Sequence, residues 1–127
     1  METKTILKSV IPVLPSADIG RDIDWYREKT GFHPVFADNM YAVLLREQLC
    51  LNLQWHADTD NDPLLGGSVI RISVKNIRPI FEEFVQRGTV APDSFRENTA
   101  WGTREFGFYD LNGNAVFIFE EIEKNET

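Results

Sequence analysis

One pattern of strand and helix signals occurs twice in this chain of 127 residues, and it restricts the possible folds more than any other feature of the sequence. In each copy, an apolar stretch is followed by an amphipathic stretch with helical spacing. The first amphipathic stretch starts at Asp18-Ile19 and the second at Asn76-Ile77, an offset of 58 residues from 18 to 76. The same offset aligns Tyr26 with Phe84. We interpret the chain as two copies of one strand–helix–sheet unit.

The first copy predicts a strand, a helix and three more strands. Residues 5–14 form an apolar strand candidate, and the prolines in and after it suit an edge or the end of a strand. A helix follows, which Ser16 can cap and Gly31 can end, because glycine tolerates the left-handed backbone that closes many helices. The remaining strand candidates of this copy are residues 32–37, 40–46 and 48–55.

The second copy repeats this order after a polar segment, residues 56–67, which ends in two glycines and is interpreted as a linker. A strand is expected over about 70–74 and a helix over about 77–87, which Gly88 ends. Further strands are predicted near residues 93–97, 103–109 and 114–121. Residues 110–113 contain an Asn-Gly pair, which indicates a hairpin turn between the last two strands.

The two copies predict one α+β domain covering residues 1–127, built from two βαβββ modules at about 1–60 and 61–127. Hydrophobic residues make up 43% of the chain and charged residues 26%, which is typical of globular domains rather than of disordered or fibrous chains. Each unit alone would leave one face of its sheet bare. Pairing the units places both helices on the outside of a curved mixed sheet and leaves a concave cavity on the other side.

Simple features of the composition indicate which partners the protein can bind and in which compartment it is expected. The net charge of −7 repels phosphate backbones, which argues against nucleic acid and for neutral or cationic partners. No apolar run approaches the roughly 20 residues that span a bilayer, and no signal-peptide pattern is found. We therefore expect a cytoplasmic protein without membrane contact. The single cysteine, Cys50, excludes an internal disulfide and is interpreted as a small strand residue.

No pattern of catalytic residues is found in the sequence. It has no glycine-rich phosphate loop, no Ser or Cys nucleophile motif and no paired-carboxylate signature. His33 and His56 are expected at the surface. The acidic run at residues 58–62 lacks the glycine and the bidentate glutamate of a calcium loop, so it is interpreted as a solvated loop. The sequence therefore predicts no catalytic residue and no cofactor.

Alternation along the strands predicts which side chains face the cavity. In the strand 48–55, the leucines at odd positions share the face that packs under a helix, which leaves Asn52 and Gln54 on the cavity face. In the strand near 70–74, the isoleucines take the helix face, which leaves Arg71 on the cavity face. Phe117 is expected on the same side of the last strand, together with Phe119.

Aromatic residues complete the set of candidates. Trp101 is the most suggestive, because a large ring between polar residues and a glycine has few partners in a core. Trp55 shares its face with leucines and is expected in the core. The candidate ligand-binding residues are Trp101, Asn52, Gln54, Arg71, Phe117, Phe36 and Tyr41. The alternative is that the polar members satisfy one another in a filled core and that Trp101 packs in an interface.

Several short motifs resemble those of a known superfamily. They are residues 11–19 (Ile-Pro-Val-Leu-Pro-Ser-Ala-Asp-Ile), Trp25-Tyr26, Gly31-Phe32, residues 100–106 (Ala-Trp-Gly-Thr-Arg-Glu-Phe) and residues 110–114 (Asp-Leu-Asn-Gly-Asn). Together they resemble the vicinal oxygen chelate superfamily, which includes glyoxalase I, extradiol dioxygenases, fosfomycin-resistance enzymes and bleomycin-resistance proteins. The last two motifs are most similar to the bleomycin-resistance-like members. The resemblance implies a homodimer whose pockets form at a two-fold interface.

The resemblance also implies where a metal would bind. Metal-dependent members place one His, Gln or Glu on an inner position of each of four strands. Three of these positions carry Ile11, Val69 and Phe117 in this chain, and only the fourth, near Asn52 or Gln54, is polar. A neutral amide is a poor sole ligand for a divalent ion, so we predict no metal site.

The leading hypothesis is a protein that sequesters an aromatic small molecule without turnover, as the resemblance to bleomycin-resistance proteins implies. The acidity of the chain is compatible with a cationic ligand. The alternative is a metal-dependent lyase or dioxygenase of the glyoxalase fold with an atypical ligand set. A third class is an interaction module whose cavity is closed by its own side chains.

Overall fold

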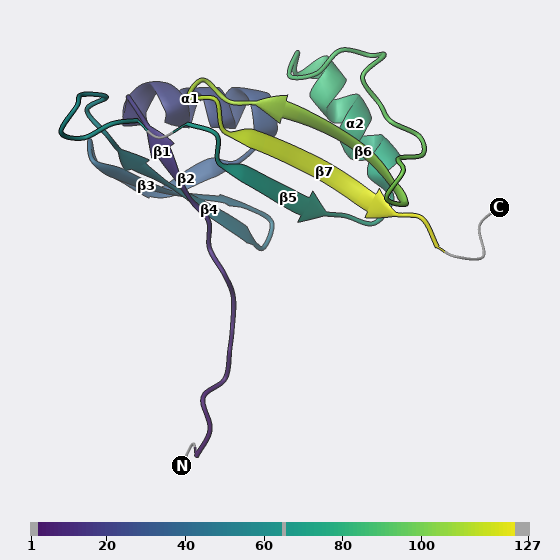
Figure 1. The fold of residues 1–127 in the computed structure, drawn as a ribbon, viewed down its shortest axis with the longest axis horizontal. Helices are drawn as coiled ribbons and strands as arrows, with labels where there is room; N and C mark the ends of the chain where they lie inside the picture. Colours follow the sequence, from purple (N-terminus) through teal and green to yellow (C-terminus); the bar gives the residue numbers. More distant parts are fainter. Residues whose placement is uncertain (1–2, 65, 124–127) are drawn as a thin grey trace.

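The computed structural model describes residues 3–64 and 66–123, and within them two helices and seven strands form two mixed sheets (Figure 1). The strands of the first sheet lie in the order β1-β4-β3-β2, and those of the second sheet in the order β5-β7-β6. In the first sheet β1 pairs with β4 in parallel, and in the second sheet β5 pairs with β7 in parallel. The other neighbouring strands pair antiparallel. This arrangement confirms the predicted α+β class.

The bounds of the elements agree closely with the sequence prediction. They are β1 (Val13–Ser16), α1 (Ile19–Thr30), β2 (His33–Ala37), β3 (Tyr41–Arg46), β4 (Leu49–Trp55), β5 (Val69–Ser73), α2 (Ile77–Gln86), β6 (Thr103–Tyr109) and β7 (Ala115–Glu121). Apart from β1 and the strand predicted near 93–97, every predicted end lies close to the observed one. Neither helix of the described residues is long and apolar enough to cross a membrane.

Each helix covers one face of one sheet. Helix α1 contacts β2, β3 and β4, and α2 contacts β6 and β7. Leu51 and Leu53 of β4 are buried in the core with α1, and Phe106 of β6 is buried with α2. Burial of each such side chain contributes about 1.5–3 kcal/mol. Ile72 of β5 packs against both cores, so the two cores meet at this strand. The period-two prediction is confirmed for β4 and β5.

Local sequence explains where α1 begins and ends. Asp18 is the N-cap, because its Oδ1 accepts a hydrogen bond from the backbone N–H of Arg21 at 3.0 Å. The prediction that Ser16 caps the helix is wrong, since its hydroxyl turns inward and donates to the buried carboxylate of Asp22 at 2.5 Å. Gly31 ends the helix at φ 77°, the left-handed conformation expected of it.

Two strand predictions are wrong. Residues 5–12 pair with no strand of the described chain, and residues 3–12 form an extended N-terminal arm that leaves the body of the molecule (Figure 1). Pro12 lacks an N–H group, and only its carbonyl is bonded, to the N–H of Asn52 at 2.9 Å. Near 93–97 only Arg96 pairs, opposite Glu105, because the preceding residues form a turn.

A buried polar network joins the β6–β7 hairpin to α1. Asp110 accepts hydrogen bonds from the Tyr26 hydroxyl at 2.6 Å and from the N–H groups of Asn112 at 2.8 Å and Asn114 at 3.0 Å. The Asn112 amide donates to Asp22 at 2.7 Å. Asp22 is 1% exposed and Asp110 is 7% exposed, and a buried carboxylate without partners costs several kcal/mol. The hairpin is therefore held in one position against α1.

Replacing Tyr26 with Phe tests this network. The variant keeps the ring in the core but removes one of the donors to Asp110. We expect the free energy of unfolding, measured by urea denaturation, to fall by about 1–3 kcal/mol. Tyr109→Phe is the matched control, because Tyr109 is 71% exposed, and it should change the value by less than about 0.5 kcal/mol. Equal effects of the two variants would contradict a stabilising role of the network.

Candidate functional site

The predicted residues of the second sheet lie on the side that faces away from α2, which we call the open face. On β6 the even-numbered side chains pack on α2, so Glu105 and Gly107 point to the open face. Phe119 of β7 lies opposite Glu105, Phe117 lies opposite Gly107, and Arg71 of β5 lies opposite Phe117. A Cβ added to Gly107 would lie 2.5 Å from the Phe117 ring, so this ring covers the glycine.

Glu105 is the hydrogen-bonding centre of the open face, although it is only 1% exposed. Its Oε1 accepts hydrogen bonds from the Thr103 hydroxyl at 2.5 Å and from the indole N–H of Trp101 at 2.8 Å, and an Arg71 nitrogen lies 3.5 Å away. Burial by itself raises the pKa of a carboxyl group. Here the two donors and the Arg71 charge outweigh burial and hold the pKa of Glu105 below its usual value. Glu105 is therefore ionised at neutral pH and acts as a fixed acceptor.

Trp101 lies in the loop before β6 and is held from two sides. Its N–H bond to Glu105 fixes one edge of the ring. The guanidinium carbon of Arg96 lies 4.9 Å from the ring centroid, and the backbone pairing of Arg96 with Glu105 places it there. The side chain of Trp101 is nevertheless 54% exposed. The ring is thus oriented by the protein and still available to a ligand.

The other predicted residues lie on the first sheet, on the side that faces away from α1. Asn52 donates a hydrogen bond from Nδ2 to the Tyr41 hydroxyl at 2.9 Å. Gln54 lies opposite Tyr41, and Phe36 and Asn52 flank Val43 in one row across the sheet. Phe36 is 54% exposed. These four predicted residues therefore form one patch with mixed polar and aromatic character.

The structure brings the seven predicted residues together as two groups. Trp101, Arg71 and Phe117 lie on the open face of the second sheet, and the other four lie on the first sheet. Within residues 3–64 and 66–123, no hydrogen bond, ion pair or ring contact joins one group to the other. That all seven contact one ligand stays a prediction. Trp55 lies on the helix side of β4, packed on the first core, as expected.

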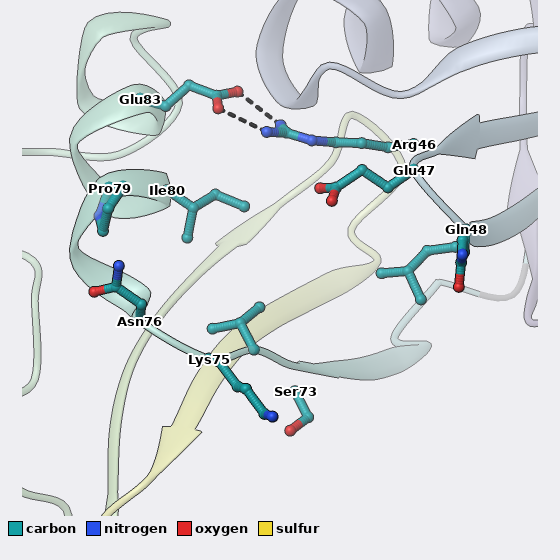
Figure 2. Close-up of a pocket in the computed structure, with 11 residues that line it drawn as sticks. Arg46, Glu47, Gln48, Ser73, Lys75, Asn76, Pro79, Ile80 and Glu83 are labelled. Carbon is teal, nitrogen blue, oxygen red and sulfur yellow. Dashed lines mark hydrogen bonds and ion pairs between the residues drawn. The ribbon is translucent and has the colours of Figure 1, made fainter.

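A groove of about 820 Å³ lies between the β3–β4 turn and the start of α2 (Figure 2). Its Arg46 guanidinium forms two hydrogen bonds of 2.7 Å with Glu83 of α2 and one of 2.7 Å with the Thr30 carbonyl. Arg87 binds the same Glu83 carboxylate at 2.7 Å. These charges connect the two cores at this end of the molecule. None of the seven predicted residues lines the groove.

A second hollow of about 430 Å³ lies between the start of β4 and β5. Residues 9–12 of the N-terminal arm and Arg71 line it. Strand β1 pairs only with residues 52–55, so residues 49–51 of β4 have no strand neighbour on this side. Strand β5 has none on its outer edge either, within the described part of the chain. Two unpaired strand edges therefore flank the hollow.

Three of the four positions that would carry metal ligands have no donor atoms. Ile11 belongs to the N-terminal arm, Val69 starts β5, and Phe117 covers Gly107. His56 is paired with a carboxylate, that of Asp62, at 2.7 Å. In the part of the chain that the structure describes, no three His, Cys, Asp or Glu side chains converge as a metal site. These residues do not fit a divalent metal.

Two residues of the open face, Glu105 and Arg96, are not among the candidates predicted from the sequence. Glu105 alternates with the core residues Phe106 and Phe108, and this period of two is the signal that could have placed it beside Trp101. Arg96 has no such signal. It reaches Trp101 through a single bridge outside any regular strand, so only the folded chain reveals its position.

Comparison with known proteins points to one family. The model of the Glyoxalase/Bleomycin resistance protein/Dioxygenase superfamily matches residues 9–118. The chain is 25% identical to a bleomycin resistance protein of Geobacillus stearothermophilus, over 89% of this chain and 96% of the relative. The bleomycin resistance protein of Staphylococcus aureus matches with the same identity and coverage.

Solved structures share the fold. A bleomycin-binding protein complexed with bleomycin gives a TM-score of 0.74 at 21% identity, over 91% of this chain and 99% of that one. A glyoxalase/bleomycin resistance protein/dioxygenase from Nocardioides gives a TM-score of 0.75 at 16% identity, over 97% of this chain and 89% of that one. A glyoxalase-related enzyme from Clostridium phytofermentans gives a TM-score of 0.72 at 17% identity, over 95% of this chain and 100% of that one. The same fold thus occurs in binding proteins and in enzymes, so function depends on the site.

Replacing Glu105 with Gln tests its ionisation. Because the pKa of Glu105 is lowered in the folded state, its ionisation stabilises the protein above the usual value of 4.5, and this contribution is lost as the pH falls through the folded-state pKa. We expect the stability gap between the parent protein and Glu105→Gln to be present near pH 7 and to narrow as the pH falls below 4.5. Urea denaturation at a series of pH values measures the gap. A gap that stays constant with pH would contradict an ionised Glu105.

Proposed function

The chain belongs to the glyoxalase/bleomycin resistance protein/dioxygenase superfamily, and on this basis we propose that it binds and sequesters an aromatic small molecule without converting it. The proposal depends on one observation, the half-exposed Trp101 ring that Glu105 holds in a fixed orientation. Phe117 and Phe119 add apolar surface on the same face. Apolar walls with a few oriented polar groups are typical of ligand sites.

The chemistry of the open face supports binding rather than turnover. Glu105 is the buried carboxylate of that face, and three neighbouring groups keep it charged with a lowered pKa. A general acid or base needs a pKa near the working pH, which Glu105 does not have. The guanidinium groups of Arg71 and Arg96 donate hydrogen bonds and have no acceptor atom. The groups around Trp101 can therefore orient a ligand but are poorly suited to move its protons.

The relatives suggest which ligand to test first. Proteins named for bleomycin resistance and a structure of a bleomycin-binding protein with bleomycin are similar to this chain. We extend this to the chain as a proposal, namely that it confers antibiotic resistance by sequestering an aromatic drug. The third class, an interaction module with a closed cavity, is less well supported, because Trp101 is 54% exposed.

We also propose that the chain acts as a homodimer. The N-terminal arm exposes 68% of Ile6, 94% of Leu7 and 95% of Val10. Burying each of these side chains would contribute about 1.5–3 kcal/mol, and one chain leaves them in water. A second copy presents the unpaired edges of β4 and β5 beside the 430 Å³ hollow. Two-fold exchange of arms would cover both sets of exposed groups at once.

Sedimentation tests the dimer. We expect a particle of about twice the 14.6 kDa chain mass at about 100 μM protein. The double variant Leu7→Glu, Val10→Glu should sediment as a monomer, because charged side chains cannot be buried in an apolar contact. Leu111→Glu is the matched control, since Leu111 is 51% exposed in the β6–β7 turn, and it should stay dimeric. A parent protein that is monomeric at this concentration would contradict the dimer.

Elemental analysis addresses the alternative function, a metal-dependent lyase or dioxygenase with an atypical ligand set. Since Ile11, Val69 and Phe117 offer no donor atom, we expect no stoichiometric Ni, Zn, Fe or Mn in protein purified without added ions. The result that would favour the enzyme is about one metal ion per chain that is lost in an Asn52→Ala variant.

Replacing Trp101 with Ala tests the binding site. A native mass spectrometry screen of aromatic compounds, bleomycin included, supplies the ligand, and calorimetry gives its Kd. An aromatic contact is worth about 0.5–1.5 kcal/mol beyond buried area, so the variant should bind at least about 10-fold more weakly. Its free energy of unfolding should fall by about 1–3 kcal/mol, because the buried Glu105 loses one donor while Trp101 itself is 54% exposed.

Trp55→Ala is the comparison for a core tryptophan, and it should lower the free energy of unfolding by about 3–5 kcal/mol. A Trp101→Ala variant that loses as much stability as Trp55→Ala, with unchanged affinity, would remove Trp101 from the site.

A further inference from the structure

Two arginines of the open face, Arg71 and Arg96, lie near Trp101, although the whole chain has a net charge of −7. Glu105 is 1% exposed and its Oε1 is already bonded to Thr103 and Trp101. The Arg71 side chain is 40% exposed and lies over Phe119, 4.2 Å from the ring centroid. Arg96 is exposed beside Trp101. The exposed Glu121 lies at the end of β7 on the same face, opposite Thr103. A ligand that stacks on Trp101 nevertheless meets two guanidinium groups beside the ring, while Glu105 is too buried to reach it.

Arg96 differs from most arginines of the described chain. Six arginines are ion-paired with a carboxylate: Arg21, Arg46, Arg71, Arg78, Arg87 and Arg104. Arg78 shows the complete arrangement, because it lies 4.3 Å from the Phe95 ring centroid and is also paired with Glu97. Arg96 has the ring but no carboxylate within residues 3–64 and 66–123. Its five N–H donors remain available to a planar acceptor.

We propose that the Trp101 site takes a planar aromatic acid, whose ring stacks on the indole and whose carboxylate is bound by Arg96, with Arg71 as a second positive charge. This inference rests on the proposed function, because it names the class of molecule that the same site binds. A guanidinium matches a carboxylate in two parallel hydrogen bonds, and charge-assisted bonds of this kind are the strong ones. The ring and the charge of the ligand are thus recognised by neighbouring side chains.

The same geometry disfavours the cationic ligand that the net charge suggests. The electron-rich face of an indole attracts a cation, but Arg96 already supplies one at 4.9 Å. A second cation stacked on Trp101 would be repelled by Arg96 and by Arg71. Acidic residues farther than about one Debye length from Trp101 are screened in physiological salt. Local charge at the open face therefore decides the preference.

Three probes with one common ring test the proposal: naphthoate, naphthamide and naphthylmethylammonium. They differ in charge and share the stacking surface. By calorimetry near neutral pH, we expect naphthoate to bind at least about 10-fold more tightly than the cation, with the amide between them. Higher salt should reduce the difference between naphthoate and the amide, since exposed charges are screened.

Variants assign the preference to its residues. Arg96→Gln should remove most of the difference in affinity between naphthoate and naphthamide. Arg78→Gln is the matched control, because Arg78 also lies over an aromatic ring but is paired with Glu97, and it should keep the preference. An Arg96→Gln variant that keeps the full preference would overturn the assignment.

The failure of this inference can be told apart from failure of the proposed function. Equal affinity for the three probes, tightest binding of the cation, or no binding of naphthoate below about 1 mM would overturn the aromatic acid. The proposed function survives the first two results if Trp101→Ala weakens all bound probes together. If Trp101→Ala binds every probe as tightly as the parent protein does, the proposed site itself is wrong.

Discussion

The arrangement of the molecule depends on two buried carboxylates, Asp22 and Asp110. Asp110 organises its own turn through the N–H groups of Asn112 and Asn114, and it also binds Tyr26 of α1. Asp22 completes the connection by accepting a hydrogen bond from the side-chain amide of Asn112. A buried charge without partners is costly, so every member must stay in place at once. This requirement joins residues that lie about 90 positions apart in the chain and sets where the β6–β7 hairpin sits.

The position of the hairpin then decides what the open face contains. β7 is the central strand of the second sheet, so Phe117 and Phe119 project between Arg71 on one side and Glu105 on the other. Glu105 in turn orients Trp101. The Arg46–Glu83 ion pair holds the two cores together at the opposite end, where Figure 2 shows both side chains across the groove. With both ends fixed, the strands of the second sheet set the positions of Arg71, Phe117 and Glu105 on the open face.

A single chain leaves parts of this fold without partners. The N-terminal arm carries apolar side chains into solvent, and the edges of β4 and β5 flank a hollow that no strand of the described chain fills. Exposed edges and exposed apolar arms are both surfaces that proteins cover by association. The family shows two ways of using such a fold, binding and catalysis, and the side chains of this chain favour binding.

The sequence by itself determined the repeated unit, nearly all element bounds and the faces of β4 and β5. These features follow from period two in strands and from glycine at helix ends, which are local properties of the chain. The side of Arg71 and the exposure of Trp101 were predictable for the same reason. The sequence prediction failed for residues 5–12 and near 93–97, because strand pairing depends on a neighbour and not on propensity alone.

Tertiary structure alone decided the contacts that join distant segments. Serine is a common residue type at helix N-caps, yet the Ser16 hydroxyl donates a hydrogen bond to Asp22, and Asp18 caps the helix instead. Arg96 reaches Trp101 only because one backbone bridge sets it opposite Glu105. Net charge predicted a preference for cations, whereas the folded chain places the guanidinium groups of Arg71 and Arg96 near Trp101. Composition sums over the whole chain, but a ligand responds to the charges within a few ångströms of it.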